Sequence, residues 1–304
     1  MNIKKAMRVA VPVVATFTII GASWGVFNYS DGMYKESYSS LQQYGDRKIE
    51  MPYNASQDNY KIVPYEIKKD ADSLVARLND GKDATHTDYE SVLKLLSAVE
   101  GKDIVMFITS GGLGKTPLDK QKGWNTVIEG TKSVLNDMGY NTLIVEYRRT
   151  EPNLQQFIGE LITGFESGAE DLSFTINFLQ KYYPNLKFVM ESESFGAMLN
   201  NTAMKFFVDN QNVYSIQAGI LEIPKLSENY APNNTLRIND NGIEPDSLND
   251  MNIPYIVFNN LKNLNEILQD WKKIEVPGHR YSWDLKEVRN EITSYLNNVF
   301  GQLN

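Results

Sequence analysis

Short apolar runs alternate with segments whose apolar residues recur at helical spacing, from about Tyr60 to the end of the chain. The run from Ile104 to Thr109 leads into Ser110-Gly-Gly-Leu-Gly114, which predicts a buried strand that enters a glycine-rich turn. Apolar residues from Val127 to Met138 then follow a helical period, and Thr142 to Glu146 is the next predicted strand. Together these segments predict one βαβ unit.

The same alternation continues through the second half of the chain. A helical stripe from Leu172 to Tyr183 precedes a strand at Lys187 to Glu191, and the last helix has an apolar face from Leu285 to Val299. Further strand candidates are Val213 to Ile223, Pro254 to Asn259 and Lys273 to Val276. Strands that alternate with helices predict an α/β fold, with a mostly parallel sheet and helices on both faces.

Two segments lack this alternation. Residues 28–59 are polar, contain many Tyr and Ser residues, and predict a stalk. Residues 224–252 are rich in Asn, Pro and Asp without a clear period, and predict a long loop or small cap over the site. The predicted folded domain therefore spans residues 60–304, and we find no internal repeat in it.

The first 27 residues differ from the rest of the chain. Lys4, Lys5 and Arg8 precede an uncharged run from Val9 to Phe27, which is about the length that crosses a bilayer. Positive charge before the run predicts a cytoplasmic N-terminus and an exported remainder. The small residues Gly21 to Ser23 also suit a cleavage site, so the segment is either a transmembrane signal anchor or a cleaved signal peptide. The folded domain is then anchored outside the cytoplasm, or secreted or periplasmic.

The amino-acid composition argues against several kinds of partner and functional site. Thirty Lys and Arg against 38 Asp and Glu give a net charge of −8, which argues against a nucleic-acid partner. Cysteine is absent, which excludes disulfides, thiolate metal sites and a cysteine nucleophile. Only two histidines occur, His86 and His279, so a multi-histidine metal site is not expected. We expect neither a metal nor a cofactor.

A serine-centred turn carries the chemistry. In the stretch from Phe188 to Met198, an apolar strand leads to Ser194 and then to a helix-compatible run, as in a nucleophile elbow. The residues two positions to either side must be small, because the sharp turn brings them close together. Ser192 and Gly196 meet this requirement, although the G-x-S-x-G motif has serine here in place of its first glycine.

With this elbow, the chain resembles the α/β-hydrolase family from Lys102 to Leu303. The resemblance implies that Ser194 is the nucleophile and that the backbone N–H of Phe195 is one oxyanion donor. Ser110-Gly-Gly-Leu-Gly114 looks like the glycine-rich loop of the family, which implies a second donor at Gly112 or Leu113.

His279 lies in Val276-Pro-Gly-His279, just before the last predicted helix, where the family places its general base. An imidazole is needed because a serine hydroxyl is a poor nucleophile until its proton is taken. His86 lies in a polar segment at the start of a predicted helix and is interpreted as a surface residue.

The third member of the catalytic group is left open among three residues. The family usually has an acid after the strand that precedes the histidine, and the position that aligns with it is Asn263. An asparagine can orient a histidine but cannot balance its charge. Glu266 and Glu222 are the alternatives.

The glycine-rich loop also admits another interpretation. Gly111 to Thr116 is similar to a phosphate-binding loop of the form G-x-x-x-x-G-K-[ST], with Lys115 as its lysine. However, Thr109 replaces the first glycine, and Pro117 and Gly123 interrupt the helix that should follow.

The sequence as a whole predicts an exported or membrane-anchored serine hydrolase. Its expected partner is a small acyl substrate with an ester, thioester or amide bond, and residues 9–27 would contact the membrane if they are not cleaved. The alternatives are a catalytically silent binding protein of the same fold and a nucleotide-binding protein.

Overall fold

The computed structural model describes residues 48–50, 65–78, 86–111, 123–148, 160–161, 163–223, 227–247 and 276–301. The predicted membrane segment, most of the predicted stalk and the strand candidate from Pro254 to Asn259 lie outside these ranges. Among the helices that are described, none is both long enough and apolar enough to cross a membrane.

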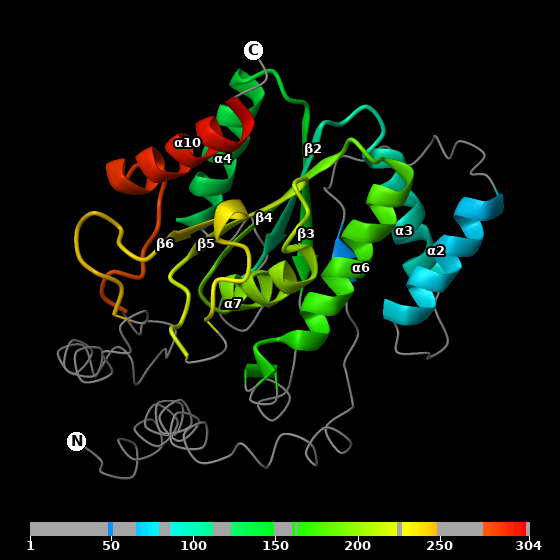
Figure 1. The fold of residues 1–304 in the computed structure, drawn as a ribbon, viewed down its shortest axis with the longest axis horizontal. Coiled ribbons are helices and arrows are strands. Elements are labelled where there is room, and N and C mark those ends of the chain that lie inside the picture. Colours follow the sequence, from blue (N-terminus) through cyan, green and yellow to red (C-terminus); the bar gives the residue numbers. More distant parts are fainter. Residues whose placement is uncertain are drawn as a thin grey trace, which may run out of the picture.

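Within the described part of the chain, a six-stranded sheet forms the centre, with the strand order β1-β3-β2-β4-β5-β6 (Figure 1). The strands from β3 to β6 in this order run parallel, and β1 pairs antiparallel with β3 at the edge. The strands are β1 (Lys48–Glu50), β2 (Ile104–Thr109), β3 (Thr142–Arg148), β4 (Lys187–Glu193), β5 (Val213–Ala218) and β6 (Thr235–Ile238). Parallel strands end at the same edge, so the loops after β2, β4 and β5 meet there.

Helices cover both faces of the sheet (Figure 1). On one face lie α6 (Glu166–Tyr182) and α7 (Ser194–Ala203). On this side α2 (Tyr65–Leu78) contacts α6, and α3 (His86–Ala98) contacts α2 and the edge strand β1. On the other face lie α4 (Trp124–Asp137) and α10 (Lys286–Phe300). The predicted α/β architecture with helices on both faces is confirmed.

The central strands supply both hydrophobic cores. Every residue of β2 is buried, as the continuous apolar run predicts. Ile104, Met106 and Ile108 pack against α4 and α10, whereas Val105 and Phe107 pack on the opposite face. This division follows from the alternation of side chains along a strand.

The structure corrects two segment predictions. The predicted loop at residues 224–252 contains a short 3₁₀ helix, η4 (Pro232–Asn234), followed by β6, which extends the sheet beside β5. Within the predicted stalk, Lys48–Glu50 forms β1. Both strands are too short for a hydrophobic period to be visible in the sequence, and pairing with an existing sheet edge stabilises them.

Candidate active site

The elbow at Ser194 has the strained backbone that its motif predicts. β4 ends at Glu193, and α7 begins at Ser194, whose φ is 56°. Among the described residues, the other non-glycine residue with a positive φ is Phe165, which precedes α6. A serine in the left-handed backbone region is energetically unfavourable, and such backbone strain is typical of functional positions.

Tight packing beneath the elbow requires glycine at position 196. A Cβ atom there would lie 2.5 Å from the carbonyl oxygen of Thr109 and 2.9 Å from that of Ser110. The first turn of α7 therefore rests directly on the end of β2. No larger residue fits without moving the helix away from the sheet.

Ser192 takes the place of the first glycine of the motif and is held by a buried hydrogen-bond network. Asn200 Nδ2 donates to Ser192 Oγ at 2.7 Å, and Thr109 Oγ1 donates to Asn200 Oδ1 at 2.9 Å. All three side chains are buried. The hydroxyl thus links β4, α7 and β2 beneath the elbow, which is a physical reason for serine at this position.

His279 contacts a carboxylate that the sequence did not reveal. Its Nδ1 lies 2.6 Å from Oδ2 of Asp246, and the Tyr281 hydroxyl donates to the same oxygen at 2.6 Å. Asp246 is fully buried and the His279 side chain is 15% exposed. Because an ionised carboxylate only accepts hydrogen bonds, Nδ1 of His279 is the donor, and in the neutral ring Nε2 is left as an acceptor.

The surroundings of His279 favour its charged form. Burial lowers its pKa, but the hydrogen bond to Asp246 and the negative charges of Asp246 and Glu193 outweigh burial, so the pKa is raised. The pKa of Tyr281 is also raised, by burial and then by the neighbouring Asp246. Tyr281 therefore stays a neutral hydrogen-bond donor.

Two loops hold the His279–Asp246 pair together. Ser247 donates to the carbonyl oxygen of Pro277 through both its backbone N–H at 3.0 Å and its hydroxyl at 2.7 Å. Gly278 has a φ of 76°, and a Cβ there would lie 2.1 Å from the carbonyl oxygen of Pro245. The backbones of the two loops are thus in direct contact, which fixes the relative positions of the acid and the histidine.

Gly219 shows where this pair lies relative to the elbow. A Cβ on Gly219 would lie 2.5 Å from Asp246 Oδ2 and 2.6 Å from His279 Cε1. Gly219 directly follows β5, whose Ala218 is the register partner of Glu193 on β4. Adjacent strands are about 4.8 Å apart. The His279–Asp246 pair therefore covers the end of β5, beside the end of β4 that carries Ser194.

The other predicted site residues fall into two groups. Gly112, Leu113, Asn263 and Glu266 lie outside the described residues. Glu222 is exposed after β5, and the carboxylate bonded to His279 is Asp246, which corrects the choice of Glu222. Phe195 lies in the first turn of α7, and its predicted role as an oxyanion donor stays a prediction. His86 is the first residue of α3.

Asp246 was missed because it lies inside the segment predicted as a loop. It follows β6, a strand with no visible hydrophobic period, and precedes His279 by 33 residues. One signal was available: an aspartate between Ser194 and His279 gives the chain order Ser, Asp, His that α/β-hydrolases share. Several carboxylates in this part of the sequence satisfy the same order, so the sequence could not select among them.

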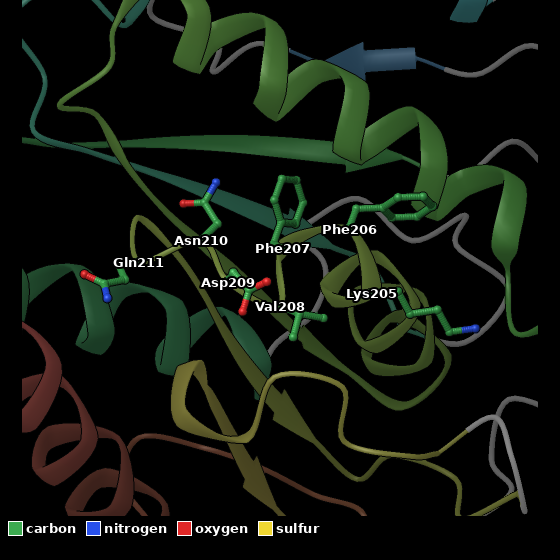
Figure 2. Close-up of a pocket in the computed structure, with 7 residues that line it drawn as sticks. All are labelled: Lys205, Phe206, Phe207, Val208, Asp209, Asn210 and Gln211. Carbon is green, nitrogen blue, oxygen red and sulfur yellow. The ribbon is translucent and has the colours of Figure 1, made fainter.

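A surface hollow lies at the other end of α7. Lys205 to Gln211, from η3 (Met204–Phe207) and the following turn, line it (Figure 2). The ten residues of α7 span about 15 Å and separate this hollow from Ser194. It contains none of the predicted site residues. Within the described ranges, no group of three His, Cys, Asp or Glu side chains could hold a metal ion.

Comparison with known proteins adds little. No family model and no curated protein matches the chain. Among solved structures, it is similar to Trichoderma reesei cutinase in complex with a C11Y4 phosphonate inhibitor, with a TM-score of 0.40 and 12% sequence identity. The alignment covers 78% of this chain and 93% of that chain.

Proposed function

We propose that this chain is a serine hydrolase that cleaves an ester, thioester or amide bond of a small acyl substrate through Ser194, His279 and Asp246. The observation that carries the proposal is the 2.6 Å hydrogen bond between His279 and Asp246 over the end of β5, beside the left-handed Ser194. A strained serine at a strand-to-helix turn and a histidine oriented by a buried acid form the arrangement that activates a serine nucleophile.

The proposed reaction proceeds in two halves. Nε2 of His279 takes the Ser194 proton while Oγ bonds to the carbonyl carbon, and the tetrahedral intermediate then expels the alcohol, thiol or amine, which receives that proton from Nε2. Water next attacks the acyl-enzyme with His279 again as base, and the carboxylic acid leaves as Ser194 is regenerated. Asp246 holds the required tautomer and stabilises the imidazolium in both halves.

The negative oxygen of each tetrahedral intermediate needs hydrogen-bond donors. The Phe195 amide is the proposed donor on the elbow side, because it lies at the N-terminus of α7, where the helix dipole favours negative charge. The glycine-rich loop after β2 is proposed to supply the other donor, at Gly112 or Leu113. Gly111, the last described residue of that loop, lies against Glu193 beside the elbow, which is consistent with this role.

The two alternative functions lose support. A catalytically silent binding protein would be favoured by the lack of an acid beside His279, and the contact of His279 with Asp246 removes this argument. A phosphate-binding role for Gly111 to Thr116 is disfavoured by Glu193, whose Oε1 would lie 3.3 Å from a Cβ on Gly111. A carboxylate at that position would repel a phosphate. Export, and anchoring through residues 9–27, stay predictions from the sequence.

Labelling with a fluorophosphonate probe tests the proposal, because the probe reacts with activated serines. We expect the full chain to be labelled, Ser194→Ala to abolish labelling, and His279→Ala to reduce its rate strongly. Ser73→Ala, at an exposed serine of α2, and His86→Gln are matched controls that should label like the wild type. Undiminished labelling of Ser194→Ala would refute the assignment, and a folded wild type without labelling would favour the silent binding protein.

A further inference from the structure

Glu193, the residue before the nucleophile, places a second carboxylate at this site. It is the last residue of β4 and faces the same side of the sheet as Val189, which packs in the core formed with α4 and α10. Its side chain lies against the glycine-rich loop, since a Cβ on Gly111 would approach Glu193 Cγ to 2.9 Å. The carboxylate therefore lies against the glycine-rich loop after β2, and β4 itself has β5 as its neighbour on the other side.

The end of β5 is where His279 and Asp246 lie. Glu193 is in register with Ala218, and the next residue, Gly219, has His279 and Asp246 at the position of its missing Cβ. Two carboxylates from different elements therefore lie close to one imidazole: Asp246 from the loop after β6, and Glu193 from the end of β4. Asp246 contacts His279 directly, whereas Glu193 acts through its charge.

The electrostatic effects agree with this placement. The pKa of Glu193 is raised, mainly by burial and further by the nearby Asp246, and the charged His279 opposes this rise. In return, the charge of Glu193 is one of the causes that raise the pKa of His279. Among the described residues, Tyr281 also lies beside the pair and is neutral, the exposed Asp240 acts on Tyr281, and the neighbouring Arg280 is exposed. Glu193 and His279 thus each favour the charged form of the other.

We propose that Glu193 is a positioning residue for catalysis, a second carboxylate that joins Asp246 in stabilising the positively charged ring of His279. The catalytic part of this inference rests on the proposed function of the site. In the reaction, Glu193 stabilises the imidazolium that forms when Ser194 loses its proton. The negative charge of Glu193 also increases the fraction of His279 that is protonated at a given pH. The enzyme therefore needs a higher pH to reach full activity.

Titration of His279 by NMR tests the electrostatic part without requiring activity. The full chain, labelled with ¹³C-histidine, contains two histidines, and His86→Gln identifies the His279 signal. We expect Glu193→Gln to lower the midpoint of the His279 titration. Glu193→Asp, which keeps the charge, should titrate closer to the wild type. Glu129→Gln, at an exposed site on α4, removes one negative charge elsewhere and should leave the midpoint unchanged.

The pH dependence of fluorophosphonate labelling tests the catalytic part. For Glu193→Gln we expect the half-maximal rate at a lower pH, together with a lower plateau rate. An unchanged His279 midpoint in a folded Glu193→Gln protein would overturn the inference, even if the wild type is an active hydrolase. A shifted midpoint in a chain that is never labelled would instead refute the proposed function and leave the coupling between Glu193 and His279 standing.

Discussion

Oδ2 of Asp246 accepts hydrogen bonds from both His279 Nδ1 and the Tyr281 hydroxyl, each at 2.6 Å. The two donors flank Arg280 on one short segment before α10, so a single stretch of chain both carries the histidine and fixes its acid. Tyr281 is itself buried and packs edge-on against Trp124 at the start of α4. The orientation of the acid therefore depends on the core as well as on the histidine.

Asp246→Asn should leave the fold intact and abolish most activity. An amide at this position can donate to His279 and so favour the wrong tautomer, and it cannot balance the imidazolium charge. We expect the labelling rate to fall on the order of 10³–10⁴-fold. The rate constant for fluorophosphonate labelling measures this. Glu222→Gln, at the exposed carboxylate after β5, is the control and should label at the wild-type rate.

Tyr281→Phe should shift the pH dependence in the direction opposite to Glu193→Gln. Without the tyrosine hydroxyl, the Asp246 carboxylate loses one donor and interacts more strongly with His279, which raises the pKa of the imidazole further. The half-maximal labelling rate is then expected at a higher pH than in the wild type. The lost bond to a charged acceptor should also cost about 1.5–3 kcal/mol of unfolding free energy, measured by urea denaturation. A shift to lower pH would contradict this role for Tyr281.

Gly219→Ala should damage the site more than the fold. The added methyl group would occupy the space of Asp246 Oδ2 and His279 Cε1, so the pair must move away from Ser194. A displacement of about 1 Å can reduce a catalytic rate about 10²-fold. Gly139→Ala is the matched control, because Gly139 also has a positive φ, 93°, but has open space at its Cβ. The control should lose stability but keep its labelling rate.

Glu191 should make stability depend on pH. This residue of β4 is fully buried and neither carboxyl oxygen has a hydrogen-bond partner among the described residues. Burial raises the pKa of the Glu191 carboxyl to about 8, and the Thr131 side chain lowers this pKa by a smaller amount. In the unfolded chain the carboxyl ionises from its ordinary pKa of 4.5, whereas in the fold it stays neutral to about pH 8. Glu191 therefore destabilises the fold progressively between these two values and by a constant amount above pH 8.

Urea denaturation of Glu191→Gln at several pH values measures this effect. We expect the variant to gain stability relative to the wild type as pH rises from 4.5 to about 8, by about 1.4 kcal/mol per pH unit. The ionisation of His279 also makes stability depend on pH, but it does so equally in the variant and in the wild type. Its contribution therefore cancels in the difference between their unfolding free energies. Glu129→Gln, at an exposed carboxylate of α4, is the control, and its stability relative to the wild type should not change over this pH range. If the difference in unfolding free energy between Glu191→Gln and the wild type does not change with pH, the pKa of the Glu191 carboxyl is not raised.

The sequence by itself determined the features that depend on neighbouring residues. The buried strand β2 is a continuous apolar run and β4 contains the apolar stretch from Phe188 to Met190, so both are visible locally. The strand-to-helix turn at Ser194 is visible as well, because it needs small residues two positions away. His279 was identified by its position before the last predicted helix, where the resemblance to the α/β-hydrolase family implies the general base, and it is the only histidine in this part of the chain.

Only the tertiary structure decided which carboxylate contacts that histidine. Asp246 lies next to His279 because two loops separated by about 30 residues share backbone contacts and because Gly219 leaves room for both side chains. The strand that positions Asp246 is short and derives its stability from pairing with β5. The approach of Glu193 to the same imidazole depends on strand register. Contacts of this kind leave no period or motif in a sequence, since they depend on where distant segments meet.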